Sequence, residues 1–190
     1  MGGHKFDPEN AKRLDHPERR AMLAPERVIT DIRAEPGQVW AEVGCGNGFF
    51  TVPLAAKARK VHALDISEQM LDKLRTNLVE SGVSNVEPMR SAENTLPLSD
   101  GSVDGVLMAF VAHEFDEPVM AFAEAGRILK AAGRLAVVEF AKVESWGPPL
   151  EHRVSPEEVE DWARRAGLAL ARSWEWDRAI IGWTFAASGD

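Results

Sequence analysis

Three glycines at alternate positions, Gly44, Gly46 and Gly48, form the stretch of the sequence best suited to binding a cofactor. They follow a short apolar run that contains Glu42, and a segment of helical character begins at Phe50. Glycine allows positive φ angles and lets a ligand approach the backbone, because it has no Cβ. The N-terminus of a following helix offers unpaired N–H groups to an anionic group. We therefore expect a strand, a glycine-rich turn and a helix that bind a ligand together.

The spacing of the glycines separates two kinds of ligand. A dinucleotide-binding turn has the spacing G-x-G-x-x-G, which would place its third glycine at position 49. This chain has Phe49 at that position, and its third glycine is Gly48. A nicotinamide cofactor is therefore the less favoured ligand, and a glycine-rich turn that binds nothing is the simplest alternative.

Further polar residues lie where other predicted strands end. Asp65 follows the strand predicted over residues 60–64, and His113 lies just beyond the strand predicted over residues 103–110. Ligands of open α/β sheets bind at the carboxyl ends of the strands. Histidine can take up a proton near neutral pH, so His113 is the candidate general base, with Glu114 as the next candidate. A surface or capping role for His113 is the alternative.

Alternating strands and helices must position these residues. This alternation predicts an α/β fold with a parallel, doubly wound sheet and helices on both faces. The last two strands are separated only by a short turn at residues 177–178, so they should be antiparallel neighbours. Ser67 and Ser155 are the predicted N-caps of two helices. The predicted strands cover residues 38–43, 60–64, 86–90, 103–110, 134–140, 168–176 and 179–187, and the predicted helices cover residues 50–57, 118–129 and the segments that follow the two serines.

The composition limits the possible functions. The chain has 190 residues, a net charge of −8 and one cysteine, Cys45. Its length predicts one domain over residues 1–190, with an N-terminal helical segment over residues 1–34 and a core over residues 35–190. The negative charge argues against binding to a nucleic-acid backbone, which needs a basic face. The single cysteine fits a reducing, cytoplasmic location, and no apolar run is long enough to predict a membrane span.

The order of elements and four short stretches resemble the class I S-adenosylmethionine (SAM)-dependent methyltransferases. The sequence of these stretches is most similar to the small-molecule methyltransferases of the ubiquinone and menaquinone biosynthesis type. The resemblance implies a Rossmann-like, mostly parallel seven-stranded sheet whose last strand is antiparallel. It also implies SAM as the cofactor and S-adenosylhomocysteine as the product. The stretches are Glu42–Gly48, Leu64–Ser67 with Met70 and Leu71, Ser91–Pro97, and Val103–His113 followed by Gly133–Leu135.

The resemblance also assigns cofactor contacts to individual residues. Asp65 is expected to accept hydrogen bonds from both ribose hydroxyls, and Ile66 to lie on the adenine face. Ser91 stands where similar proteins usually have an aspartate for the adenine amino group, and its hydroxyl can still accept one hydrogen bond. Glu42 is expected to lie near the methionine moiety and to help place its ammonium group. The cofactor-binding set is Glu42, Gly44, Cys45, Gly46, Gly48, Asp65, Ile66, Met70, Ser91, Ala92, Glu93, Ala109 and Phe110.

Several subclasses of acceptor are argued against by the residues after the fourth predicted strand. Amino-methylating nucleic-acid enzymes carry an Asn/Asp-Pro-Pro-aromatic signature there, whereas this chain has Ala109, Phe110, Val111 and Ala112. The same positions lack the carboxylates that would hold Mg²⁺ in catechol-type enzymes. Arsenite methyltransferases need several cysteines. We therefore expect a small organic acceptor, with oxygen, carbon or nitrogen as the accepting atom, and no metal ion.

Two segments outside the cofactor stretches are expected on the acceptor side. The N-terminal segment from His4 to Arg20 is the expected lid or wall of the site, although scattered surface charges are the commoner explanation for its arginines. A non-catalytic SAM-binding module that regulates a partner would keep the cofactor stretches and lack acceptor chemistry. The sequence does not indicate an oligomeric state. The candidate acceptor-side residues are Phe6, Arg13, Arg19, Trp146 and His152.

Overall fold

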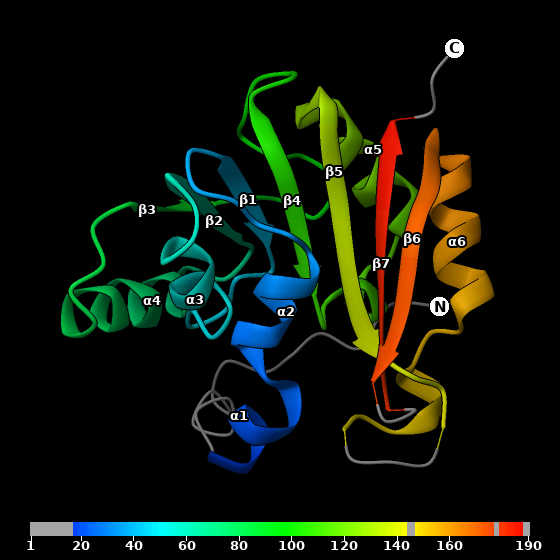
Figure 1. Ribbon diagram of the computed structural model, residues 1–190, viewed down its shortest axis with the longest axis horizontal. Coiled ribbons are helices and arrows are strands. Elements are labelled where there is room, and N and C mark those ends of the chain that lie inside the picture. Colours follow the sequence, from blue (N-terminus) through cyan, green and yellow to red (C-terminus); the bar gives the residue numbers. More distant parts are fainter. Residues whose placement is uncertain (1–16, 144–146, 177–178, 188–190) are drawn as a thin grey trace.

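A single seven-stranded sheet forms the centre of the molecule, with the strand order β3-β2-β1-β4-β5-β7-β6 (Figure 1). The computed structural model describes residues 17–143, 147–176 and 179–187. All seven predicted strands are present, and their ends differ from the predicted ones by at most one residue, except at the start of β5. The strands are β1 (Val39–Val43), β2 (Lys60–Asp65), β3 (Val86–Arg90), β4 (Val103–Ala109), β5 (Leu129–Phe140), β6 (Leu168–Trp176) and β7 (Ile180–Ala187).

The pairing of the strands confirms the expected Rossmann-like arrangement. β1 pairs in parallel with β2 and β4, and the parallel pairing extends outward to β3 and β5. β7 is antiparallel to both β5 and β6, so the last two strands are antiparallel neighbours as predicted. The turn predicted at residues 177–178 lies outside the described residues. Because β1, β2, β4 and β5 run in one direction, their carboxyl ends meet at one edge of the sheet.

Helices cover both faces of the sheet (Figure 1). The first four helices share one face, where their apolar residues form clusters with alternate residues of the strands. The last two pack against the opposite face. No helix in the described part of the chain is long and apolar enough to cross a membrane. The helices are α1 (Pro17–Leu23), α2 (Pro25–Asp31), α3 (Thr51–Ala55), α4 (Glu68–Glu80), α5 (Pro118–Ile128) and α6 (Pro156–Arg165), with 3₁₀ turns η2 (Ala112–Glu114) and η3 (Leu150–His152).

Both predicted serine caps are present at the helix N-termini. The Ser67 side chain accepts a hydrogen bond from the backbone N–H of Met70 at the start of α4. Ser155 begins α6 with a complete capping box, in which the Glu158 side chain accepts from the Ser155 N–H. These bonds satisfy N–H groups that have no partner within the helix. The caps therefore fix where α4 and α6 begin.

The beginning of β5 was predicted wrongly. The sequence pattern predicts a helix up to Leu129 and a strand from Arg134, whereas α5 ends at Ile128 and β5 begins at Leu129. Leu129 pairs with Val103 at the start of β4. The register then shifts between Val103 and Gly105, which accommodates the additional residues on β5. A pairing partner distant in the sequence thus decides this boundary.

The two outer strands of the sheet are irregular. Asn85 accepts a backbone hydrogen bond from Val61, and Ser91 donates one to Asp65, so the odd-numbered residues of β3 pair with β2. Pro88 therefore lies in the outward-facing row of β3, where its missing N–H costs the sheet no hydrogen bond. At the opposite side of the sheet, β6 has a register shift between Leu170 and Arg172.

The packing of β4 against β1 yields a first testable prediction. Gly105 lies beside Trp40, which is fully buried, and a Cβ at Gly105 would come within 2.5 Å of the indole ring. Gly105→Ala should destabilise the protein by about 1–3 kcal/mol, because the core cannot accept the methyl group without moving the ring. Chemical denaturation measures this change in the free energy of unfolding.

Gly126 provides the matched control. It lies in α5, and a Cβ there would meet its nearest neighbour, Leu168, at an ordinary 3.5 Å. Gly126→Ala should be neutral or should stabilise the protein by about 0.5–1 kcal/mol, because alanine favours the helix. Equal destabilisation by both substitutions would contradict the proposed role of the Trp40 contact.

Candidate functional site

The glycine-rich turn follows β1 and is hydrogen-bonded to the end of the neighbouring strand β2. Gly44, Gly46 and Gly48 have φ angles of 72°, 54° and 97°, which are in the region that favours glycine. The backbone N–H groups of Gly44 and Cys45 donate to the carbonyl oxygen of Leu64 in β2, at 2.8 and 3.0 Å. The turn is therefore attached to the carboxyl end of the neighbouring strand.

Two of these glycines also have a packing role that the sequence did not indicate. A Cβ at Gly44 would lie 2.5 Å from Cγ2 of Val111, which follows β4. A Cβ at Gly48 would lie 2.6 Å from Cδ1 of Leu74 in α4. The turn is therefore closely packed on two sides, by the β4 loop and by α4.

Asp65 connects the glycine-rich turn to the helix that follows β2. Its Oδ2 accepts a hydrogen bond from Gly46 N and its Oδ1 accepts one from Ser67 N, both at 2.8 Å. Burial raises the pKa of Asp65, and the backbone N–H donors oppose this effect. Each carboxylate oxygen has a second lone pair for a further donor. The adjacent Ile66 is 44% exposed, so an apolar surface lies next to the carboxylate.

Glu42 is a buried acid at the base of the turn. Its side chain is 2% exposed, and Oε2 accepts a hydrogen bond from the Thr51 hydroxyl at 2.6 Å. Burial raises the pKa of Glu42 to about 8; the Thr51 bond opposes this shift, and the charge of Asp65 adds to it. In the ligand-free protein Glu42 is therefore mostly uncharged at neutral pH. It would ionise readily beside a cation, because opposite charge lowers the pKa of an acid.

The other residues predicted to contact the cofactor differ in burial and in hydrogen-bond partners. Cys45 and Met70 are 3% and 4% exposed, and burial raises the pKa of the Cys45 thiol well above its ordinary value, which makes a nucleophilic role unfavourable. Ser91 and Ala92 follow β3, with the N–H of Ser91 donating to the Asp65 carbonyl. Glu93 accepts hydrogen bonds from the N–H groups of Asp116 and Glu117, so its carboxylate anchors the loop before α5.

Four phenylalanine rings form a row at the carboxyl edge. The successive ring centroids of Phe49, Phe50, Phe110 and Phe140 lie 4.9, 5.6 and 4.6 Å apart. Arg19 of α1 lies 4.2 Å from the centre of the Phe49 ring at one end of the row. Ala109 and Phe110, which were both predicted to line the site, are each 8% exposed.

The backbone of Phe110 is strained. Its φ of 55° is costly for a residue with a side chain, by about 1–3 kcal/mol. Its N–H donates to the Val138 carbonyl at 2.8 Å. This hydrogen bond to the sheet keeps the Phe110 backbone in its strained conformation. The next residue, Val111, is thereby directed against Gly44. Strained residues of this kind are concentrated at functional sites.

His113 forms a pair with Glu139 near the end of β5. Its Nδ1 lies 2.9 Å from both Glu139 oxygens, and its backbone N–H donates to Oε1 at 3.1 Å. Glu114, the second predicted catalytic residue, has Oε1 4.0 Å from His113 Nε2. Burial lowers the pKa of His113, but Glu139, with a smaller contribution from Glu114, more than offsets this, so the pKa is raised.

Glu139 is a residue that the sequence reasoning missed. It stands next to the last residue of the strand predicted over residues 134–140, and its side chain is 1% exposed. The available signal was that β1 and β2 also carry an acid at or near the carboxyl end, Glu42 and Asp65. Three acids at the carboxyl ends of three parallel strands of one sheet could have been predicted to face the same edge.

Arg153 organises the loop between β5 and α6. It is 4% exposed, and its guanidinium donates to the carbonyl oxygens of Ala141, Val143 and Pro148 at 2.7–3.0 Å. It also lies 5.6 Å from the centre of the Phe140 ring. The loop and α1 lie near the two sides of the carboxyl edge (Figure 1). His152 lies in η3 within this loop, whereas Trp146, Phe6 and Arg13 lie outside the described residues.

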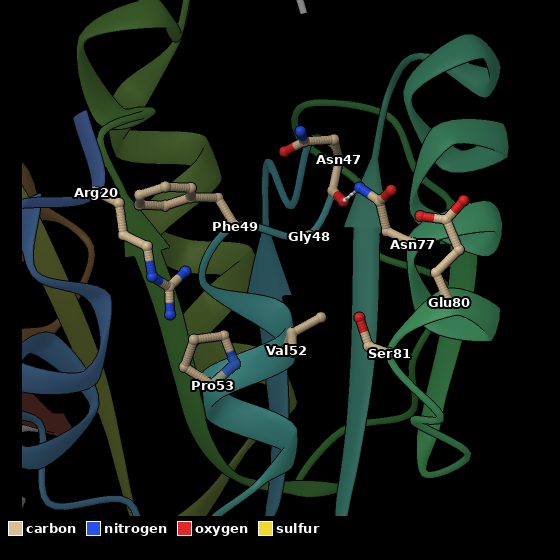
Figure 2. Close-up of a pocket in the computed structure, with 9 residues that line it drawn as sticks. All are labelled: Arg20, Asn47, Gly48, Phe49, Val52, Pro53, Asn77, Glu80 and Ser81. Atoms are coloured by element: carbon tan, nitrogen blue, oxygen red, sulfur yellow. Dashed lines mark hydrogen bonds between the residues drawn. The ribbon is translucent and has the colours of Figure 1, made fainter. Parts of the chain in front are cut away.

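A further hollow of about 280 Å³ is lined on one side by the end of the glycine-rich turn (Figure 2). Arg20, Val52, Pro53 and the end of α4 line it, and Asn77 Nδ2 donates to the Asn47 carbonyl at 2.9 Å on one side. Its ionisable residues, Arg20 and Glu80, are exposed. The hollow therefore contains none of the acids or the histidine described above.

Comparison with known proteins identifies the family. A model of the methyltransferase domain matches residues 41–137, which include the glycine-rich turn, Asp65 and His113. The chain belongs to the methyltransferase domain family. SAM is accordingly the cofactor of this domain.

Three relatives illustrate the similarity. A SAM-dependent methyltransferase of Aquifex aeolicus superposes with a TM-score of 0.90 and 34% identity, over 95% of this chain and 98% of that one. A ubiquinone/menaquinone biosynthesis C-methyltransferase of Paraburkholderia phymatum is 34% identical over 64% of this chain and 50% of its own length. A ubiquinone biosynthesis O-methyltransferase of Xanthomonas euvesicatoria is 26% identical over 85% of this chain and 70% of its own length. The expected resemblance is confirmed, although the chain spans only about half the length of the first of these two biosynthetic relatives.

The position of Asp65 generates a prediction about cofactor affinity. Asp65→Ala removes the carboxylate that is expected to accept hydrogen bonds from the ribose hydroxyls, and it should weaken SAM binding at least about tenfold, since one such hydrogen bond contributes about 1.5–3 kcal/mol. Isothermal titration calorimetry measures the dissociation constant. Asp72→Ala, on the exposed surface of α4, is the control and should bind SAM normally. Unchanged affinity in a folded Asp65→Ala protein would exclude the ribose assignment.

The burial of Glu42 generates a prediction about stability. Glu42 holds its proton in the folded state up to a pH of about 8, whereas an unfolded glutamate loses it near 4.5. The folded state therefore binds more protons between these values, and its stability falls as the pH rises. Glu42→Gln keeps an acceptor for Thr51 and removes this dependence. The stability of the variant relative to the original protein should rise by about 2–4 kcal/mol from pH 5 to pH 8 in urea unfolding. A difference that stays constant with pH would contradict the buried, protonated state.

Proposed function

We propose that this chain transfers a methyl group from SAM to a small organic acceptor, with His113 as the base that removes a proton from the acceptor. The observation that carries the proposal is the arrangement at one edge of the sheet. The glycine-rich turn, the Asp65 carboxylate and the exposed Ile66 lie at the ends of β1 and β2. The His113–Glu139 pair lies beyond the end of β4 and at the carboxyl end of β5.

The chemistry of the residues fits SAM at this edge. The unused lone pairs of Asp65 suit the ribose hydroxyls, the exposed Ile66 suits the adenine ring, and the buried Glu42 suits a nearby positive charge. Ser91 and the backbone that follows it would complete the adenine side. When bound, SAM supplies a methyl group activated by its sulfonium, and transfer leaves the sulfur as the neutral thioether of S-adenosylhomocysteine. The protein contributes orientation and the exclusion of water.

The raised pKa of His113 supports a proton-transfer role. A base is most effective when its pKa is close to the working pH, because it is then both largely unprotonated and sufficiently basic. An acceptor with a weakly acidic O–H or C–H group, such as a phenol or an enol, needs such a base. Two of the relatives are a C-methyltransferase and an O-methyltransferase, which agrees with carbon or oxygen as the accepting atom.

The proposal also includes the cellular location, the size class of the acceptor and the role of the N-terminal segment. The single buried thiol of Cys45 supports a cytoplasmic location, and the net charge of −8 supports a small-molecule acceptor rather than a nucleic acid. The division into a covering segment over residues 1–34 and a core over residues 35–190 stays a prediction. The contact of Arg19 with Phe49 supports the placement of α1 beside the site.

A thermal-shift comparison tests the cofactor. SAM and S-adenosylhomocysteine at about 100 times their dissociation constants should each stabilise the fold by about 2.7 kcal/mol, whereas NAD should not. Stabilisation by NAD alone would favour a nicotinamide-dependent oxidoreductase and contradict the proposal.

An acceptor screen tests the reaction. Phenols, enols and amines are incubated with SAM, and formation of S-adenosylhomocysteine is followed by mass spectrometry. For an acceptor that is methylated in this screen, His113→Ala should lower the rate of methylation about 10²–10⁴-fold while SAM affinity is retained. SAM binding without turnover of any acceptor would instead favour a non-catalytic, partner-regulating module. Full activity of the His113→Ala protein would remove His113 as the base.

A further inference from the structure

Glu139 holds both the ring and the backbone of His113. The two carboxylate oxygens lie at the same distance, 2.9 Å, from Nδ1, and Oε1 also accepts from the His113 N–H at 3.1 Å. Oε2 is 3.2 Å from the backbone N–H of Phe140, which donates to it. The Glu139 side chain is 1% exposed, so water competes little for these bonds. The position of the imidazole ring is therefore determined by β5.

The donors and acceptors at this pair determine the tautomer of the imidazole. A carboxylate oxygen can only accept hydrogen bonds, so Nδ1 of His113 must carry the hydrogen that it shares with Glu139. A neutral imidazole has one protonated and one unprotonated nitrogen. Nε2 is consequently the nitrogen with the free lone pair.

We propose that Glu139 is a positioning residue that fixes His113 as its Nδ1–H tautomer and thereby makes Nε2 the atom that takes the proton from the acceptor. The proposal rests on the proposed role of His113 as base. In this step the acceptor's O–H or C–H bond breaks, its electron pair stays on the acceptor, and a new N–H bond forms at Nε2. The Glu139 carboxylate stabilises the resulting imidazolium.

The charges around His113 agree with this role. Glu139 in β5 and Glu114 in η2 favour the protonated ring, while Arg153, which follows η3, and burial disfavour it. His113 is 10% exposed, so a small part of the ring remains accessible.

A purely structural anchor is the alternative role for Glu139. It would hold the loop after β4 through the same bonds without affecting proton transfer. The two roles differ in what they predict for the protonation of the ring, since an anchor of the backbone does not require a particular tautomer. A measurement on the ring nitrogens therefore separates them.

Nuclear magnetic resonance of the histidine ring nitrogens provides this measurement in the ligand-free protein. Two-bond ¹H–¹⁵N correlation spectra distinguish the tautomers, and a His113→Gln variant assigns the signals. In the original protein His113 should be protonated at Nδ1 and should titrate above the ordinary value of about 6.5. Glu139→Gln should lower the titration midpoint by at least about one pH unit, and Glu139→Ala should also release Nε2–H tautomer. A neutral His113 protonated at Nε2 in the original protein would overturn the proposal, as would a titration midpoint unchanged by Glu139→Gln.

The chain contains a matched control for the substitution. Glu87 in β3 also pairs with a histidine, with Oε2 3.1 Å from His62 Nδ1. Unlike Glu139, it is 48% exposed and lies on an outer strand. Glu87→Gln should leave the signals of His113 and the turnover of any identified acceptor unchanged. A shift of the His113 midpoint in Glu87→Gln equal to that in Glu139→Gln would show that the effect is not local and would overturn the assignment to Glu139.

Kinetics distinguish failure of this inference from failure of the proposed function. With an acceptor identified, Glu139→Gln should lower kcat about 10–100-fold and move the pH–rate profile to lower pH, while KM and SAM affinity change little. If His113→Ala removes turnover but Glu139→Gln leaves kcat and the pH profile intact, the base is correct and the positioning role is wrong. If His113→Ala leaves turnover intact, the proposed base itself is wrong, whatever the tautomer.

Discussion

Asp65 joins three separate segments at the carboxyl edge of the sheet. It accepts a backbone N–H from the turn after β1 and another from the start of α4, while the carbonyl of the same residue pairs with Ser91 after β3. A buried carboxylate is stable only when such donors replace its water. The order of the cofactor edge therefore depends on these few charge-assisted hydrogen bonds.

The glycine-rich turn shows how one sequence feature can serve two purposes. Positive φ angles and close packing against Val111 and Leu74 would require glycine at positions 44 and 48 even without a ligand. The strained Phe110 places Val111 in this contact. The ends of β1 and β4 are thereby coupled, so the cofactor edge and the histidine that follows Phe110 form one connected structure.

Most of the fold, and about half of the candidate site, could be predicted from the sequence. The strands, the serine caps and the acid at the end of β2 are local signals, because neighbouring residues determine them. Glu139, Arg153 and the start of β5 could not be predicted in the same way. Their roles depend on partners that are 26, 10 and 26 residues away in the chain, respectively. Parallel strands bring such partners together only after the sheet has formed.

The irregular outer strands have a consequence for self-association. An exposed strand edge normally offers a row of N–H and C=O groups to which another chain can add. In β3 the outward row is interrupted at Pro88, which has no N–H, and in β6 the bulge at Leu170 and Arg172 disturbs the regular spacing. Both outer strands are therefore poor templates for a further strand, and the sheet is protected against growth into aggregates from either side.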